Sequence, residues 1–341
     1  MANYHIQLDP DGEKIATRKS FGEALVKLGG KYKNIVVLDA DLSGSVQTAK
    51  FASEYEDRHF NFGVAEQNMV GAAAGFATRG KMPFACSFSV FVTGRAWEIV
   101  RNSVCYPNLN VKLLGSHAGV LTGEDGASHQ ALEDITIMRA LPNMKVVCPA
   151  DHQEALSIME TVVEDFGPTY IRVARQGTPV IYSEAGEEGG TPAKFEFGKS
   201  DVVFGGVNES GGASLGLPKK VDICVFATGA LVGSSMFAAQ RLVDEGKKVL
   251  VVNVSSIKPI DKETIVDCAS RAGICVTAED HSVIGGLAGA VSEVLAEEGL
   301  GVKLVKIGMQ DQFGESGKPV DLYKKYGFDA DGVYETLKGL V

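Results

Sequence analysis

Short apolar runs, each followed by polar residues, recur along the first half of the chain. They cover residues 35–38, 83–88, 111–116, 145–148 and 169–174. Runs of this length that do not alternate with polar residues are typical of strands buried on both faces of a parallel sheet. Asp151 and Glu154 follow the fourth run with the spacing of a helix cap, so a helix is predicted between the last two strands. The first half therefore predicts an α/β fold.

A helix is also predicted ahead of the first strand. Ser20 and Glu23 have the spacing of a capping box, which predicts that this helix begins at Ser20. Phe21, Leu25 and Leu28 then fall on one face, as in a helix that packs against a sheet.

The second half repeats the alternation after a polar stretch. Residues 183–191 are rich in Gly and Glu, which is typical of an exposed linker. Strands are then expected over 221–227, 248–254, 274–278 and 302–307, helices over 231–244, 262–272 and 287–298, and a flexible hairpin or loop over 205–220. We expect two consecutive α/β domains with mainly parallel sheets. Their predicted limits are an N-terminal extension 1–14, a first domain 15–182, a linker 183–194 and a second domain 195–341.

Composition narrows the class of protein. The 341 residues have a formal net charge of -10, which argues against sequence-independent binding to nucleic acid, because that needs a basic face. The six cysteines are scattered without a Cys-x-x-Cys pair, which indicates buried thiols in a reducing compartment. No signal-peptide core and no run of about 18 apolar residues occurs. We therefore expect a cytoplasmic protein that does not enter a membrane.

Side chains that follow the predicted strands are the candidate site residues, because ligands of open α/β sheets bind beyond the carboxyl ends of the strands. They are Asp41, Ser45, Glu66, Phe88, Phe91, His117, Glu124, Asp125 and His129. Each has a plainer interpretation when taken alone. Glu66 suits the first turn of a helix because of the helix dipole, the phenylalanines suit a core, and Asp125-Gly126 suits a turn. The His, Glu and Asp residues match no zinc spacing, so no metal site is expected in this chain.

Taken in order, five segments resemble the transketolase family from about Ala16 to the C-terminus. They read ATRKSFGEAL, DADLSGS, FNFGVAEQNMVGAAAGFA, GSHAGVLTGEDGASHQALED and IKPID. These segments are similar to the pyrimidine-binding and C-terminal domains of that family. The family's first domain binds the diphosphate of thiamine diphosphate and its metal through Gly-Asp-Gly and Asn-Asn. Here no Asn-Asn occurs, and none of the three Asp-Gly pairs follows a glycine.

The resemblance implies four cofactor-binding residues. In the family, the glutamate at the position of Glu66 hydrogen-bonds the aminopyrimidine ring of the cofactor and stabilises its imino tautomer, which activates the thiazolium carbon. Phe88 and Phe91 match positions that stack on this ring. Asp41 matches a carboxylate close to the cofactor. Where microbial full-length members often have a third aromatic residue, this chain has Gly94-Arg95.

The resemblance also implies six substrate-binding residues, namely Arg18, Ser45, His117, Asp125, His129 and Arg175. Arginine suits a sugar phosphate because its guanidinium presents a planar set of donors that stays charged. Asp125 matches the carboxylate that binds a donor hydroxyl, and His129 matches a histidine that helps to hold phosphate. His117 and His129 join Glu66 as the implied catalytic residues.

The implied protein is the C-terminal subunit of a split transketolase. Thiamine diphosphate would be shared with a separate N-terminal subunit that holds Mg2+ or Ca2+, in a dimer or a two-plus-two heterotetramer. The reaction would transfer a two-carbon ketol unit from a ketose phosphate, such as xylulose 5-phosphate, to an aldose phosphate. The second domain is expected to be structural, and His281 to have a packing or interface role.

Three other interpretations stay open. The beta subunit of a 2-oxo-acid dehydrogenase has the same two-domain architecture, but the GEDGASHQALED run with Arg18 and Arg175 has no obvious purpose for a small 2-oxo acid. Deoxyxylulose-phosphate synthase shares parts of the phosphate site, although the segment with His117 and Glu124 favours transketolase. A scaffolding paralogue without catalysis is the non-enzyme alternative.

Overall fold

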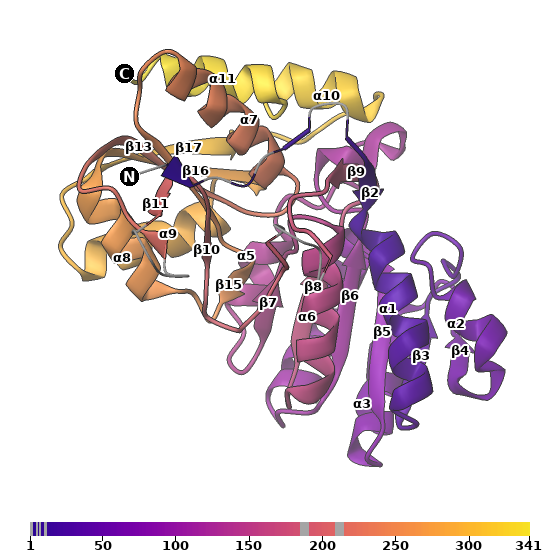
Figure 1. Cartoon of the computed structure of the whole chain (residues 1–341). Helices are drawn as coiled ribbons and strands as arrows, with labels where there is room; N and C mark the ends of the chain where they lie inside the picture. Colours follow the sequence, from indigo (N-terminus) through magenta and orange to yellow (C-terminus); the bar gives the residue numbers. More distant parts are fainter. Residues whose placement is uncertain (1–2, 5, 7, 10–11, 185–190, 209–214) are drawn as a thin grey trace.

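The computed structural model describes residues 3–4, 6, 8–9, 12–184, 191–208 and 215–341. The first domain is built on a seven-stranded sheet with the order β15-β7-β8-β6-β5-β3-β4 (Figure 1). Its strands are β3 (Ile35–Asp39), β4 (His59–Asn61), β5 (Met82–Phe88), β6 (Lys112–Ser116), β7 (Lys145–Val147), β8 (Thr169–Arg172) and β15 (Ser256–Lys258). All neighbours pair in parallel except β15 with β7. The predicted α/β class with a mainly parallel sheet is confirmed.

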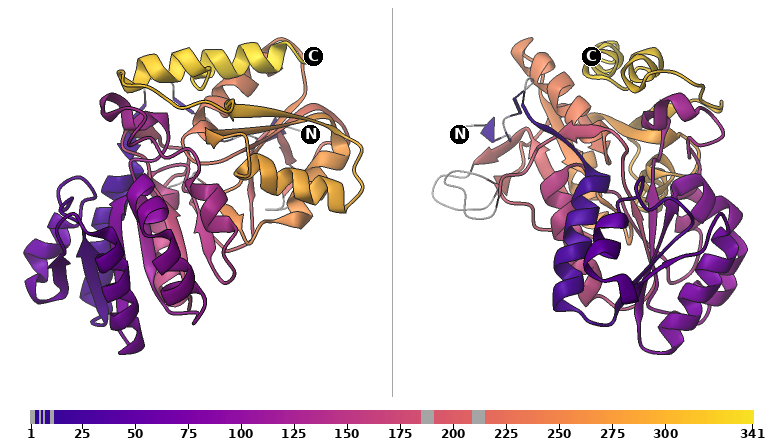
Figure 2. Two further views of the ribbon diagram at one scale, coloured as in Figure 1. Left: turned by 180° about the vertical axis from the view of Figure 1, so that it is seen from behind. Right: turned by 90° about the vertical axis from the view of Figure 1, so that its right-hand side faces the viewer.

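Helices cover both faces of this sheet, as Figures 1 and 2 show. α1 (Thr17–Lys31) and α6 (His152–Glu164) pack side by side on one face, where their apolar residues share a core with β3, β5 and β6. α3 (Glu66–Thr78) and α5 (Asp134–Arg139) contribute to the core on the other face. The remaining helical elements are α2 (Ala49–Glu54), α4 (Trp97–Ile99), the 3-10 helices η1 (Glu56–Arg58) and η4 (Val120–Asp125), and the π-helical turns η2 (Phe91–Arg95) and η3 (Val100–Cys105).

The predicted start of the first helix is wrong, whereas that of α6 is confirmed. α1 begins at Thr17, and Ser20 is buried inside it, where its hydroxyl lies 2.8 Å from His152 Nδ1. The earlier start has a tertiary cause, because the Thr17 hydroxyl accepts a hydrogen bond from the backbone N–H of Ala174 at 2.8 Å. For α6, Asp151 Oδ1 accepts from the N–H of Glu154 at 2.8 Å, as the local pattern indicates.

The second domain has a five-stranded sheet with the order β10-β14-β13-β16-β17. The strands are β10 (Asp201–Phe204), β13 (Val221–Ala227), β14 (Val249–Asn253), β16 (Ala272–Ser282) and β17 (Lys303–Met309), and only β10 runs antiparallel to its neighbour. α7 (Leu231–Asp244) and α11 (Ala330–Lys338) cover one face, and α8 (Lys262–Arg271) and α9 (Leu287–Glu297) cover the other. The predicted strands and helices of this domain are confirmed, with α10 (Pro319–Tyr326) and α11 in addition.

Short strands join distant parts of the chain. β11 (Gly206–Asn208) and β12 (Leu215–Gly216) pair antiparallel, so the expected hairpin is present, and β1 (Asn3–Tyr4) extends it. β2 (Lys14–Ala16) pairs with β9 (Gly177–Pro179). Residues 209–214 of the predicted hairpin or loop, and residues 185–190 of the predicted linker 183–194, lie outside the described residues. β15 adds a strand from the second half of the chain to the first sheet, which ties the two halves together.

Two expectations from composition can be compared with the structure. All six cysteines are buried and none forms a disulfide, as predicted. Within the described part of the chain, no helix has the length and apolar character that a membrane crossing requires.

A buried glutamate makes the stability of the fold depend on pH. Burial raises the pKa of Glu154 to about 8, although its side chain accepts hydrogen bonds from the N–H of Ala150 at 2.7 Å and from Asn253 Nδ2 at 2.8 Å. Because the folded pKa lies above the ordinary value of 4.5, the folded state binds more protons between these pH values, and stability falls as pH rises through 8.

The native chain should therefore lose stability as pH rises from about 6 to about 9, whereas Glu154→Gln should not. The difference between their free energies of unfolding should grow in favour of the variant over this range. Urea denaturation at a series of pH values measures this difference. Glu160→Gln, at a largely exposed position, is the control and should follow the native chain at every pH. Parallel profiles for Glu154→Gln and the native chain would contradict the assignment.

Candidate functional site

Four rings lie together at the carboxyl ends of β5 and β6. Phe88 stacks on His117 with centroids 4.0 Å apart, and Phe88 and Phe91 stack at 6.1 Å. The His129 ring meets Phe91 edge-on at 5.2 Å. The π-helical turn η2 directly after β5 places Phe91 beside Phe88, and π-turns of this kind are frequent at functional sites. Four of the residues that the sequence predicts are thus brought into one cluster.

Glu66 is the first residue of α3 and is only 1% exposed. The turn before it is held by Gly63, which has a φ of 67° and donates its N–H to Asn61 Oδ1 at 2.8 Å. The first turn of a helix favours a negative charge because of unpaired backbone N–H groups. Among the described residues, Oε2 of Glu66 has a hydrogen-bond donor, whereas Oε1 has none.

Arg95 is the donor to Glu66, and the sequence interpretation missed it. Its Nη1 lies 2.8 Å from Glu66 Oε2, and its guanidinium lies over the Phe91 ring at 5.1 Å. The Arg95 side chain is 49% exposed, so it closes the pair from the solvent side. The only signal in the sequence was the Gly94-Arg95 step in place of an aromatic residue. The pair connects the buried carboxylate to the ring cluster.

Two arginines meet at the edge of this cluster. Arg18 donates from Nη1 to the carbonyl of Ser45 at 2.8 Å and from Nε to the carbonyl of Arg175 at 3.2 Å. Burial and the charge of Arg175 both lower the pKa of Arg18. Arg175 also contacts the carboxylates of Glu124 at 3.3 Å and Asp125 at 3.5 Å. Two guanidinium groups held close together in this way suit an anionic ligand such as a phosphate.

His117 is nearly buried and lies close to both arginines. Burial, followed by the positive charges of Arg18 and Arg175 and by His129, lowers its pKa to about 3. The ring is therefore neutral at physiological pH and can act as a hydrogen-bond donor or acceptor. Its backbone has a φ of 57°, and the Thr122 hydroxyl donates to its carbonyl at 2.6 Å. The backbone is thus tied to the turn that leads to Asp125.

The loop after β3 carries the two remaining candidates, Ser45 and Asp41. Ser45 meets Arg18 through its carbonyl oxygen, and Asp41 is exposed, with a φ of 63°. No contact of the described residues joins Asp41 to the ring cluster. The loop is anchored by Asp39, a buried carboxylate that sequence interpretation did not select. Its Oδ2 accepts from the hydroxyls of Ser43 and Thr48, each at 2.7 Å.

Asp39 also lies 2.7 Å from His59 Nε2. Burial would raise the pKa of Asp39, but the hydrogen bonds from His59, Thr48 and Ser43 lower it below its ordinary value. No group of three or more His, Cys, Asp or Glu side chains that could hold a metal ion occurs in the part of the chain that the structure describes.

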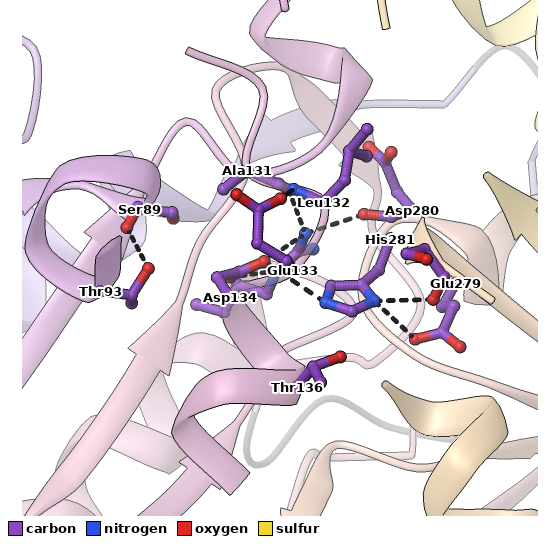
Figure 3. A network of polar contacts seen from close by, with 12 residues as sticks. Ser89, Thr93, Ala131, Leu132, Glu133, Asp134, Thr136, Glu279, Asp280 and His281 are labelled. Carbon is purple, nitrogen blue, oxygen red and sulfur yellow. Dashed lines mark hydrogen bonds and ion pairs between the residues drawn. The ribbon is translucent and has the colours of Figure 1, made fainter. Parts of the chain in front are cut away.

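A buried polar network lies where the two domains meet (Figure 3). Arg172 of β8 donates from Nε to Asp134 Oδ2 at 2.8 Å and from Nη2 to the carbonyl of Asp280 at 2.8 Å. His281 is fully buried and lies 3.8 Å from Asp134 and 3.5 Å from Glu279. This position agrees with the packing role expected for His281. The network joins β16 of the second domain to the first domain.

Comparison with protein families finds two matches. The family described as transketolase, pyrimidine binding domain, matches residues 13–180, and the family described as transketolase, C-terminal domain, matches residues 214–333.

Three similar proteins show the extent of the likeness. A protein of Methanocaldococcus jannaschii, provisionally named a transketolase C-terminal section, is 49% identical over 94% of each chain. The transketolase of Rattus norvegicus is 36% identical over the whole of this chain but only 52% of its own length. A solved structure described as a split gene transketolase, inactive beta4 tetramer, superposes with a TM-score of 0.81 at 43% identity, covering 96% of this chain and 98% of the other.

Proposed function

The chain belongs to the transketolase family, and from this premise we propose that it is the C-terminal subunit of a two-chain transketolase. In this proposal it transfers a two-carbon ketol unit from a ketose phosphate to an aldose phosphate, at a site completed by a separate N-terminal subunit. The rat enzyme, of which this chain matches 52%, and the split-gene structure support a division of the enzyme into two chains.

The observation that carries the proposal is the buried Glu66 carboxylate beside a pair of phenylalanines. One of its oxygens is held by Arg95 and the other accepts no hydrogen bond from the described residues, while Phe88 and Phe91 offer a stacking surface next to it. This arrangement fits the aminopyrimidine of thiamine diphosphate, which needs one carboxylate contact at its edge and an apolar partner for its face. When bound, the cofactor supplies a nucleophilic thiazolium carbon. Glu66 would exchange a proton with the ring at Oε1.

The sugar-phosphate part of the proposal rests on the two arginines at the edge of the ring cluster. Arg18 and Arg175 bind the phosphate of the substrate, and Asp125, beside Arg175, accepts a hydrogen bond from a donor hydroxyl. His117 and His129 contact the substrate oxygens where charge develops, and His117, neutral at physiological pH, donates or accepts a hydrogen bond there. Ser45 lines the same edge, and Asp41 lies on the loop that faces the cofactor.

The partner subunit holds the diphosphate and its Mg2+ or Ca2+ in this proposal. Two copies of each chain form a heterotetramer. The split-gene relative of known structure is a tetramer of one chain type and is described as inactive. This supports the expectation that the present chain, without its partner, assembles but does not catalyse the reaction.

Reconstitution tests the proposal. The purified chain alone is expected to show no transfer from xylulose 5-phosphate to ribose 5-phosphate. Addition of the N-terminal subunit, thiamine diphosphate and Mg2+ should give turnover in the ordinary range of about 1 to 1,000 per second. A coupled assay for the triose phosphate product measures the rate. A parallel assay with pyruvate and glyceraldehyde 3-phosphate should stay at background. Robust activity of the chain alone would refute the two-chain site.

A further inference from the structure

The segment 117–130, which bears His117, Asp125 and His129, is held at its start by a carboxylate of the second domain. Asp280 Oδ1 accepts from the N–H of Val120 at 2.9 Å, and Oδ2 accepts from the N–H of Leu121 at 3.4 Å. These are the first two residues of η4, whose own N–H groups have no helical partner there. Asp280 comes from β16 and is separated from Val120 by 160 residues. The second domain thus caps the helix that leads to Asp125.

The far end of the segment is held by a second part of the same domain. The Ser316 hydroxyl donates to the carbonyl of Glu124 at 2.6 Å, and Gln130 Nε2 donates to the carbonyl of Glu315 at 2.9 Å. α10, which follows this loop, packs against η4, and a Cβ on Gly123 would lie 2.8 Å from the ring of Pro319. The segment is therefore fixed at both ends by residues outside the first domain.

Asp280 lies close against Gly119. A Cβ on Gly119 would lie 2.2 Å from the Asp280 carboxylate, so only glycine fits, and Gly119 has a φ of 71°. Asp280 is itself locked, because Tyr323 donates its hydroxyl to Oδ2 at 3.1 Å and Arg172 donates to its backbone carbonyl. Both domains thus determine where the segment lies.

Glu279, the preceding residue of β16, offers a natural comparison. It is as fully buried as Asp280, but its carboxylate accepts from the N–H groups of Leu287 at 2.7 Å and Ala288 at 2.8 Å. It therefore caps α9 of its own domain and not the site segment. Figure 3 shows the Glu279 carboxylate beside the His281 ring.

We propose that Asp280 and Ser316 are positioning residues of the sugar-phosphate site, so that the second domain determines how the donor substrate is bound. This inference rests on the proposed function. It goes beyond a purely structural role for the second domain, because it predicts an effect on donor binding that a general loss of stability does not produce.

The test compares three variants in the reconstituted two-chain enzyme. Asp280→Asn removes the charge and one acceptor, and Ser316→Ala removes the hydroxyl at an exposed position. Both should raise KM for xylulose 5-phosphate, by about tenfold for Asp280→Asn and by less for Ser316→Ala. A small displacement of a binding group already weakens the binding of the substrate. The dissociation constant of thiamine diphosphate should stay within about twofold, because Glu66, Phe88 and Phe91 lie outside the segment 117–130. Glu279→Gln should lower the melting temperature as much as Asp280→Asn but leave KM unchanged.

Hydrogen exchange of the peptide 117–130 gives a readout that does not depend on the reaction. Its amides should exchange faster in Asp280→Asn than in Glu279→Gln, whether or not the assembly turns over sugar phosphates. Equal KM values for all variants, or an equal rise in Asp280→Asn and Glu279→Gln, would overturn the proposal. If Asp280→Asn fails to assemble, an unchanged KM in Ser316→Ala overturns it. An inactive native assembly with the expected exchange pattern would instead point to a failure of the proposed function.

Discussion

Glu66→Gln is expected to lower kcat of the reconstituted enzyme by about 100-fold to 10,000-fold. The amide has almost the same shape as the carboxylate, but it has no charge and does not exchange a proton with the pyrimidine ring. It also leaves the Arg95 guanidinium, 2.8 Å away, without its counter-charge. Initial rates with saturating xylulose 5-phosphate, ribose 5-phosphate and thiamine diphosphate measure the effect.

A matched control separates this effect from the loss of any buried carboxylate. Glu154→Gln alters a side chain that is as buried as Glu66, but whose contacts are Ala150 and Asn253 and not the ring cluster. Glu154→Gln should keep kcat within about twofold. A substitution that shares no contacts with the site acts independently of it. If Glu66→Gln turned over as fast as the native assembly, a protonatable group at this position would not be part of the reaction, and the proposed use of the site would be wrong.

The second large effect concerns stability. Arg172→Met is expected to lower the free energy of unfolding by about 3–5 kcal/mol, because it leaves a buried carboxylate without its cation. Asp134 is fully buried, and although burial would raise its pKa, the Arg172 charge lowers it below its ordinary value. Among the described residues, the carboxylate would keep the Tyr170 hydroxyl, at 2.6 Å, and the more distant His281. Chemical denaturation at one fixed protein concentration measures the loss.

An exposed ion pair of similar length provides the contrast. Lys27 Nζ lies 2.9 Å from Glu160, with side-chain exposures of 76% and 59%. Lys27→Met should change the free energy of unfolding by less than about 1 kcal/mol, because water screens the pair. If Arg172→Met were equally mild, the buried network between the domains would contribute little to stability. The double variant Arg172→Met, Asp134→Asn should recover part of the loss, since it removes the unpaired charge as well.

Features that depend on a few neighbouring residues followed from the sequence. The buried strands appear as uninterrupted apolar runs, and the start of α6 appears in Asp151, whose side chain reaches an N–H three residues away. Phe88, Phe91 and His117 could be selected because each ends a strand or follows one closely, whereas His129 lies further along the segment after β6. Their proposed roles came from resemblance to a family and not from the pattern itself.

Features that depend on distant residues did not follow. The helix α1 starts three residues before its apparent cap because Thr17 meets Ala174. β15 joins the first sheet because Ser256 pairs with Val147 of β7, a residue far away in the sequence. Arg95 was visible only as a departure from a motif, because its partner Glu66 lies 29 residues away.

The sequence by itself determined the fold class, the order of the elements and the residue types available at the carboxyl edge of the first sheet. It could do so because strand burial and helix capping are local properties of the chain. Only the tertiary structure decided which charges meet there. Arg95 neutralises Glu66, and Asp280 of the second domain holds the backbone at Val120, because these contacts depend on how separate elements pack and not on spacing along the chain.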